Sequence, residues 1–168
     1  MTIGDVAGVI VALATVGSLL YISRQVNVTR QQTKGQFLLA LDAQFEHYDA
    51  ITIRLVNEPG FTPTGDEWLQ IWGVMNVFER ISIMVDDHIL DAGMVDRLYG
   101  FRLLSLIAND EIYQRLVADG SMWQDFIDLC YAVADQRAKT GDPRDQAFSE
   151  RVRRLDKHSH SAKNPWGY

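Results

Sequence analysis

The stretch VAGVIVALATVGSLLYI, from Val6 to Ile22, decides how the whole chain is interpreted, because it is apolar and carries no charge. As a helix, its 17 residues span about 26 Å at about 1.5 Å per residue, slightly less than the roughly 30 Å hydrocarbon core of a bilayer. Ile3 and Val26 can extend the apolar run at its two ends. The stretch therefore predicts a single transmembrane helix within residues 1–23.

Two other interpretations of this stretch have less support. A secretory signal peptide has a basic leader and a cleavage site after a short apolar core, but MTIGD contains no Lys or Arg and the apolar run continues past Ala12-Leu13-Ala14. A buried helix of a soluble protein stays open, since apolar runs shorter than about 18 residues are ambiguous. Positive charges only follow the stretch, which predicts an N-terminus outside the membrane and a cytoplasmic domain. These charges are Arg24, Arg30 and Lys34.

Small residues gather on one side of this predicted helix when it is turned by about 100° per residue. The ladder Gly4-xxx-Gly8-xxx-Ala12 would allow a second helix to approach closely in lipid. Chance is the alternative explanation, because Gly is frequent in membrane helices. We expect the anchor to dock against other transmembrane helices of a membrane complex, with a homo-oligomer possible. The predicted contact face consists of Gly4, Gly8, Ala12, Thr15 and Ser18.

Composition limits the classes of function. The chain of 168 residues has a net charge of −6 and a sequence pI of about 5.1, whereas nucleic-acid-binding domains are typically basic. We therefore expect no nucleic-acid partner. A single cysteine excludes an intrachain disulfide and is compatible with a reducing compartment.

Beyond residue 23 the apolar residues recur at helical spacing, and no period-two strand pattern appears. Only Gly35 interrupts the region after the anchor, so the anchor is expected to continue into the first cytoplasmic helix. SMWQ is interpreted as a capping box of Ser121 and Gln124, and Pro143 as the start of a final polar helix. The sequence predicts an all-α protein whose anchor, residues 1–23, continues into a helical bundle, residues 24–140, with a C-terminal helix and tail, residues 141–168. The helices are expected near residues 37–57, 66–85, 92–108, 110–120, 121–139 and from 143 onward.

A central motif carries a resemblance to known proteins. It consists of Asn76, Phe78, Glu79 and Ile81, then Ile89-Leu90-Asp91, then Tyr99-Gly100. In this motif the chain resembles a group of bacterial proteins that carry an N-terminal membrane anchor before a small helical domain. The resemblance covers the anchor and about residues 37–116. It implies a bacterial origin and an inner-membrane location, but no activity, because no activity is established for that group.

Glu79 is a candidate acid on an otherwise apolar helix, one turn after Asn76. As a buried acid it could take part in chemistry. The favoured interpretation is structural: an interhelical hydrogen bond or ion pair, for instance to Arg97 or Arg102, that fixes the register of packed helices.

The other chemically capable side chains also have ordinary explanations. Asp residues beside a helix end usually form caps and turns, and no second cluster at metal-ligand spacing is present. The lone Cys130 is expected to be a core thiol. No P-loop, G-x-G-x-x-G or G-x-S-x-G motif occurs. We therefore expect no catalytic residue, no metal and no cofactor. The residues that could have been metal ligands form an Asp-rich cluster of Asp86, Asp87, His88 and Asp91.

The C-terminal sequence RVRRLDKHSHSAKNPWGY is basic and aromatic in an otherwise acidic chain. It predicts contact with anionic lipid headgroups or an acidic partner, against the alternative of a solvated helix end. The basic residues that follow the anchor are expected to make the same kind of contact. The full predicted set is Arg24, Arg30, Lys34, Arg151, Arg153, Arg154, Lys157, Trp166 and Tyr168.

Together these features favour a non-enzymatic accessory or scaffolding subunit of a larger bacterial membrane complex, respiratory or photosynthetic. Such a subunit would dock by its transmembrane helix and cover a cytoplasmic surface. The alternatives are a membrane-tethered enzyme or sensor that uses Glu79 or the Asp-rich cluster, and a phage or host exclusion factor.

Overall fold

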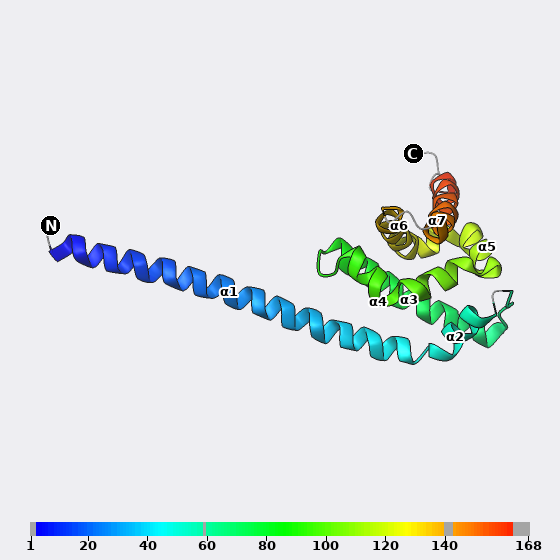
Figure 1. Ribbon diagram of the computed structural model, residues 1–168, viewed down its shortest axis with the longest axis horizontal. Coiled ribbons are helices and arrows are strands. Elements are labelled where there is room, and N and C mark those ends of the chain that lie inside the picture. Colours follow the sequence, from blue (N-terminus) through cyan, green and yellow to red (C-terminus); the bar gives the residue numbers. More distant parts are fainter. Residues whose placement is uncertain (1–2, 59, 140–142, 163–168) are drawn as a thin grey trace. The chain divides into compact units, whose positions relative to one another are not determined.

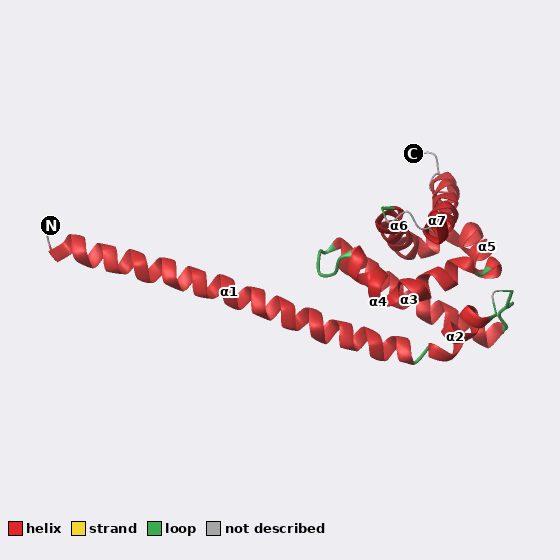
Figure 2. Ribbon diagram, viewed as in Figure 1, coloured by secondary structure: helices red, strands yellow, loops and turns green. Residues whose placement is uncertain are grey.

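A computed structural model describes the backbone of residues 3–58, 60–139 and 143–162, and most side chains between residues 21 and 155. Within these ranges every regular element is a helix (Figures 1 and 2). The all-α prediction is confirmed. The helices are α1 (Ile3–Glu46), α2 (Asp49–Asn57), α3 (Gly65–Asp86), α4 (Ala92–Ala108), α5 (Asp110–Asp119), the short 3₁₀ helix η1 (Gly120–Trp123), α6 (Gln124–Ala138) and α7 (Pro143–Ala162).

The chain divides into two compact units, residues 1–40 and residues 41–168. The boundaries expected from the sequence at residues 23 and 140 stay a prediction. The first unit is the N-terminal part of α1, and the second is the bundle. The expectation that the N-terminal helix continues directly past residue 23 is confirmed, because α1 is unbroken through Gly35.

The core of the bundle is built around α3 and α6. Phe78 on α3 is fully buried and lies between two other aromatic rings, with centroid distances of 5.1 Å to Phe45 and 6.0 Å to Phe126. Aliphatic side chains fill the space around these rings, as the 3.6-residue spacing of the sequence predicts. Other fully buried residues of the two helices include Ile71, Ile81, Ile127 and Leu129.

The helix expected over residues 37–57 is broken at His47 and Tyr48, so that prediction is wrong at this point. The backbone N–H of Tyr48 bonds to Phe45 O at 2.9 Å, and α2 begins at Asp49. The physical reason is tertiary. A Cβ atom on Gly73 would lie 2.5 Å from the Tyr48 ring, so the ring rests directly on the α3 backbone.

The prediction that SMWQ is a capping box is also wrong. Ser121 lies within the 3₁₀ helix η1, and α6 starts at Gln124 without a side-chain cap. The Gln124 side chain instead donates to Asp128 Oδ1 at 2.7 Å, one turn further along α6.

α7 begins at Pro143 as expected, but it is amphipathic rather than simply polar. Phe148, Val152 and Leu155 are buried. Tyr131 on α6 donates its hydroxyl to Val152 O at 2.8 Å. α7 is therefore an integral part of the bundle core, and it lies beside α6 (Figure 1).

Candidate functional site

The α1 helix exposes an apolar face. Ile22 and Val26 are 54% and 45% exposed, and they line a shallow groove together with Gln25 and Thr29. The Thr29 and Thr33 hydroxyls donate to carbonyls of their own helix, Gln25 O and Thr29 O, each at 2.9 Å. These two hydroxyls are therefore bonded within α1, and the Gln25 side chain is exposed on the same face.

The exposed face lies on the same side of α1 as the predicted small-residue face. Gly8, Thr15, Ile22 and Thr29 are each seven residues apart, and so are Ala12, Leu19, Val26 and Thr33. Two such interleaved series form one seam along a helix, and α1 is a single uninterrupted helix over all of them.

The structure describes only part of the predicted anchor. The side chains of Gly4, Gly8, Ala12 and Thr15 lie outside the described residues, and Ser18 is exposed. Among the residues that the structure does describe, no helix is both long enough and apolar enough to cross a membrane. The span over residues 6–22 stays a prediction from the sequence.

The predicted basic residues are only partly available for a partner. Arg24 and Arg153 are exposed. Arg151 donates to Asp110 Oδ1 at 2.9 Å and stacks on Tyr113 at 4.3 Å, while Arg154 pairs with Glu150 at 3.6 Å. Acidic and aromatic neighbours thus occupy two of the C-terminal cations. Lys34 is half-buried, and the side chains of Arg30, Lys157, Trp166 and Tyr168 lie outside the described residues.

Glu79 does not form the expected ion pair. Arg102 instead donates to Asp49 Oδ1 at 2.7 Å, and no hydrogen bond joins Glu79 to another described residue. Partial burial raises the pKa of the Glu79 carboxyl, and the negative charge of Asp125 raises it further. Asn76 is exposed and makes no interhelical hydrogen bond within the described part of the chain. The expected interhelical hydrogen bond or ion pair that would fix the helix register is therefore not formed by these two residues.

The Asp-rich cluster forms the exposed turn between α3 and α4. His88 has a positive φ of 57°, and Asp91 caps α4 by accepting the Met94 N–H at 2.8 Å. Asp86 and Asp87 are exposed. Among the described residues no three His, Cys, Asp or Glu side chains are placed to hold a metal ion.

No hydrogen bond joins a serine or cysteine to a histidine among the residues that the structure describes. Cys130 is fully buried, which confirms the prediction of a core thiol, and burial raises its pKa well above the ordinary value. His47 and His88 are exposed, and neither bonds to a serine or to Cys130.

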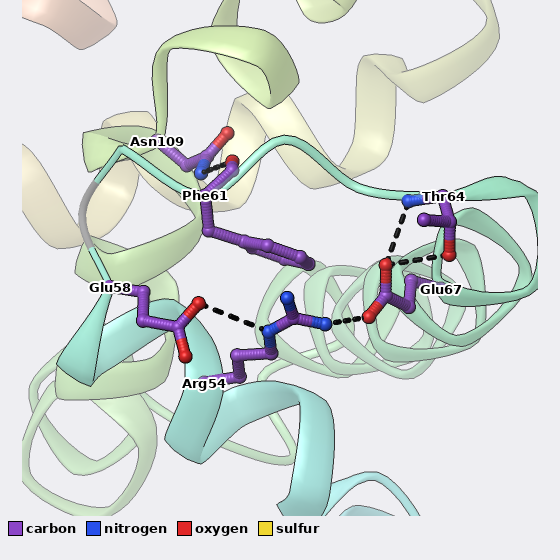
Figure 3. Close-up of polar contacts among 6 residues, drawn as sticks. All are labelled: Arg54, Glu58, Phe61, Thr64, Glu67 and Asn109. Atoms are coloured by element: carbon purple, nitrogen blue, oxygen red, sulfur yellow. Dashed lines mark hydrogen bonds and ion pairs between the residues drawn. The ribbon is translucent and has the colours of Figure 1, made fainter.

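A polar cluster that the sequence analysis missed fixes the loop between α2 and α3 (Figure 3). Arg54 bonds to Glu58 at 3.2 Å and to Glu67, and it stacks on the Phe61 ring at 4.2 Å. The Glu67 carboxylate also accepts the backbone N–H of Thr64 at 2.7 Å and its hydroxyl at 2.6 Å. The T-x-x-E spacing is a capping-box signal that could have been found.

Buried polar contacts complete this anchoring. Asn109 is buried, donates to Phe61 O at 2.8 Å and caps α5 by accepting the Ile112 N–H at 3.1 Å (Figure 3). Arg137 on α6 bonds to Asp96 on α4 at 2.6 Å and to Asp145 on α7 at 2.8 Å. These acids and bases neutralise one another, so the clusters hold helices together.

Comparison with protein families, with curated proteins and with solved structures finds no match for the chain. The resemblance to bacterial membrane-anchored proteins stays a prediction from the motif over residues 76–100.

Proposed function

We propose that this protein is a non-enzymatic accessory or scaffolding subunit of a larger bacterial membrane assembly, respiratory or photosynthetic. It docks by α1, which crosses the inner membrane with its N-terminal end outside and the bundle in the cytoplasm. The observation that carries the proposal is the exposed face of Ile22 and Val26, in register with the small residues Gly8 and Ala12.

A partner helix accounts for this face better than solvent does. Small residues at Gly8 and Ala12 would let two helix backbones approach closely in lipid. The larger Ile22 and Val26 continue the same seam, where their apolar area gains free energy on burial, at roughly 25 cal/mol per Å². A docking seam of this kind needs no catalytic group.

The charges flanking the anchor support its orientation and its contact with lipid. Arg24, Arg30 and Lys34 follow the apolar run, and a basic flank favours the cytoplasmic side. Each such residue near anionic headgroups contributes about 1 kcal/mol to membrane binding. Arg153 is exposed and can add to this attraction.

The bundle can then cover a cytoplasmic surface of the assembly. It exposes apolar side chains on several helices in addition to its core. The exposed residues are Ile53 and Val56 on α2, Leu69 and Ile83 on α3, Leu98 and Phe101 on α4, and Met122 on η1.

Co-purification of the full chain from bacterial membranes in mild detergent tests the docking. Gly8→Leu or Ala12→Leu should lower the yield of co-purifying membrane proteins about fivefold, because added bulk separates the helix backbones. Leu13→Val and Leu20→Val, on the other side of the predicted helix, are the matched controls and should change the yield little. Equal losses in both pairs would contradict docking by the small face.

A reporter enzyme fused after Tyr168 tests the orientation. A reporter active in the cytoplasm and silent in the periplasm is expected, because the basic flank follows the apolar run. Periplasmic activity would reverse the proposed topology, and recovery of the full chain in the soluble fraction would remove the anchor from the proposal.

A further inference from the structure

The bundle carries a surface groove of about 340 Å³ beside the contact of Tyr48 with Gly73. One wall is the C-terminal turn of α1 together with Tyr48, and the other is the middle of α3. Ligand pockets start at roughly 300 Å³, so the groove is large enough for a small molecule. Its polar side chains are Gln44, His47, Tyr48, Asn76 and Arg80.

A glycine lets an aromatic ring pack directly against the α3 backbone beside the groove. Any side chain at Gly73 would meet Tyr48, whose ring atoms lie 2.5 to 2.6 Å from the position of a Cβ atom. The break in the helix at His47 and Tyr48 brings that ring over α3. The apolar part of the groove lining comes from Ala43, Gly73, the Tyr48 ring and the buried Val77.

The polar lining is rich in donors and has no acid. No Asp or Glu lines the groove, although the chain has a net charge of −6. The Arg80 guanidinium is exposed and bonds to Gln44 Oε1 at a long 3.4 Å. No described carboxylate forms an ion pair with Arg80, whereas Arg54, Arg102, Arg137 and Arg151 all have acidic partners.

We propose that this groove binds the carboxylate of a small organic acid. The planar Arg80 guanidinium can form two parallel hydrogen bonds to a carboxylate. The Asn76 amide supplies a neutral donor beside it. Arg80 supplies one permanent positive charge, which matches the single negative charge of the carboxylate. The apolar part of the groove lining can contact a short hydrocarbon body. This proposal does not depend on the membrane assembly proposed above.

Ligand-observed NMR on the full chain in a neutral maltoside detergent tests the proposal, with butyrate as the probe and butyramide as its uncharged counterpart. Butyrate should bind and butyramide should bind at least about tenfold more weakly, because only the carboxylate pairs with the guanidinium. N-acetyl-Ala-Ala and its C-terminal amide form a second arm. Weaker binding of the dipeptide acid than of butyrate supports a small organic acid, whereas tighter binding would contradict it in favour of the end of a peptide chain.

Matched variants locate the binding. Arg80→Gln should weaken butyrate binding about tenfold, and Arg80→Lys by less, because the charge stays and the paired hydrogen bonds are lost. Arg97→Gln, an exposed arginine on α4, is the control and should bind as the unaltered chain does. Asn76→Ala, at an exposed position, should weaken binding a few-fold and tests the site even if Arg80→Gln fails to fold. Equal binding of butyrate and butyramide, or unchanged binding in both Arg80→Gln and Asn76→Ala, would overturn the proposal.

Discussion

The two units of the chain use the same secondary structure but dispose of their apolar side chains in opposite ways. In the bundle, Phe78 and Phe126 are fully buried against neighbouring helices. In the first unit, Tyr21 and Ile22 are more than half exposed. A helix in the bundle is stabilised mainly by tertiary burial, whereas the first unit relies on backbone hydrogen bonds of its own helix.

This contrast separates the bundle, which buries its apolar core within the chain, from the first unit, whose apolar seam is exposed. The exposed apolar seam of the first unit can be stabilised by burial only when another helix or lipid covers it. The bundle core is already buried in the folded chain and is stabilised by that burial. Substitutions in the two units should therefore affect different measurements.

The largest expected effect tests this directly. Phe78→Ala should lower the free energy of unfolding of the bundle by about 3 to 5 kcal/mol, because it leaves a cavity among three packed rings. Ile22→Ala, at a 54% exposed position, should change it by about 0.5 kcal/mol or less. Chemical denaturation of the full chain, followed by tryptophan fluorescence, measures both. Similar losses would mean that the α1 face is buried and the contrast is wrong.

A smaller effect is expected where the bundle is held by polar contacts. Thr64→Ala should cost about 1 kcal/mol, as typical losses of helix caps do. The Thr64 hydroxyl and then its backbone N–H lower the pKa of Glu67 below 4.5. An acid with a lowered pKa stabilises the fold above its unfolded pKa, and this contribution is lost as the pH falls through the lowered value.

The deficit of Thr64→Ala should therefore be full at pH 7 and shrink on acidification below about pH 4. Denaturation curves at pH 7 and at pH 3 measure this change. Thr62→Ala, in the same loop and exposed, is the control. If the loss of stability in Thr64→Ala is independent of pH, the Thr64 hydroxyl does not act through the Glu67 carboxylate.

The smallest effect has the opposite sign. Burial raises the pKa of Glu79 in the folded state, so its ionised form opposes folding at neutral pH. Glu79→Gln should raise the free energy of unfolding at pH 7 by about 0.5 kcal/mol or less, since solvent screens a half-exposed group. The gain should vanish as the pH falls below the unfolded pKa near 4.5.

Asp86→Asn, at an exposed position on the same helix, is the comparison for Glu79→Gln. A loss of stability in Glu79→Gln at pH 7 would restore the interhelical pairing expected from the sequence. A gain in stability would show that the ionised Glu79 carboxylate opposes folding.

The helices with strong local signals could be predicted from the sequence. Periodicity placed α3 within one residue at each end, and Asp91 marked the start of α4 through its cap. The break at Tyr48 could not be predicted, since no Gly or Pro stands there and the cause is a contact with Gly73, 25 residues away in the chain. Local rules carry no information about such contacts.

The same limit applies to the polar partners and to the groove. The sequence suggests Arg102 as an ion-pair partner of Glu79. Packing instead places α2 beside α4, and Arg102 pairs with Asp49. Gln44 and Arg80, which meet in the groove, are 36 residues apart. The sequence identified side chains that could bind or react, and only the tertiary packing decides which of them meet.

The position of α7 in the core has a consequence for synthesis. A ribosome makes the chain from its N-terminus, so α1 emerges before any other helix, and α7 follows all the helices that it packs against. Until Phe148 and Val152 are in place, the side of α6 that packs against α7 is uncovered and Arg137 lacks Asp145. The N-terminal helix is thus available to a membrane or to a partner subunit while its own bundle is still incomplete, so attachment can precede folding.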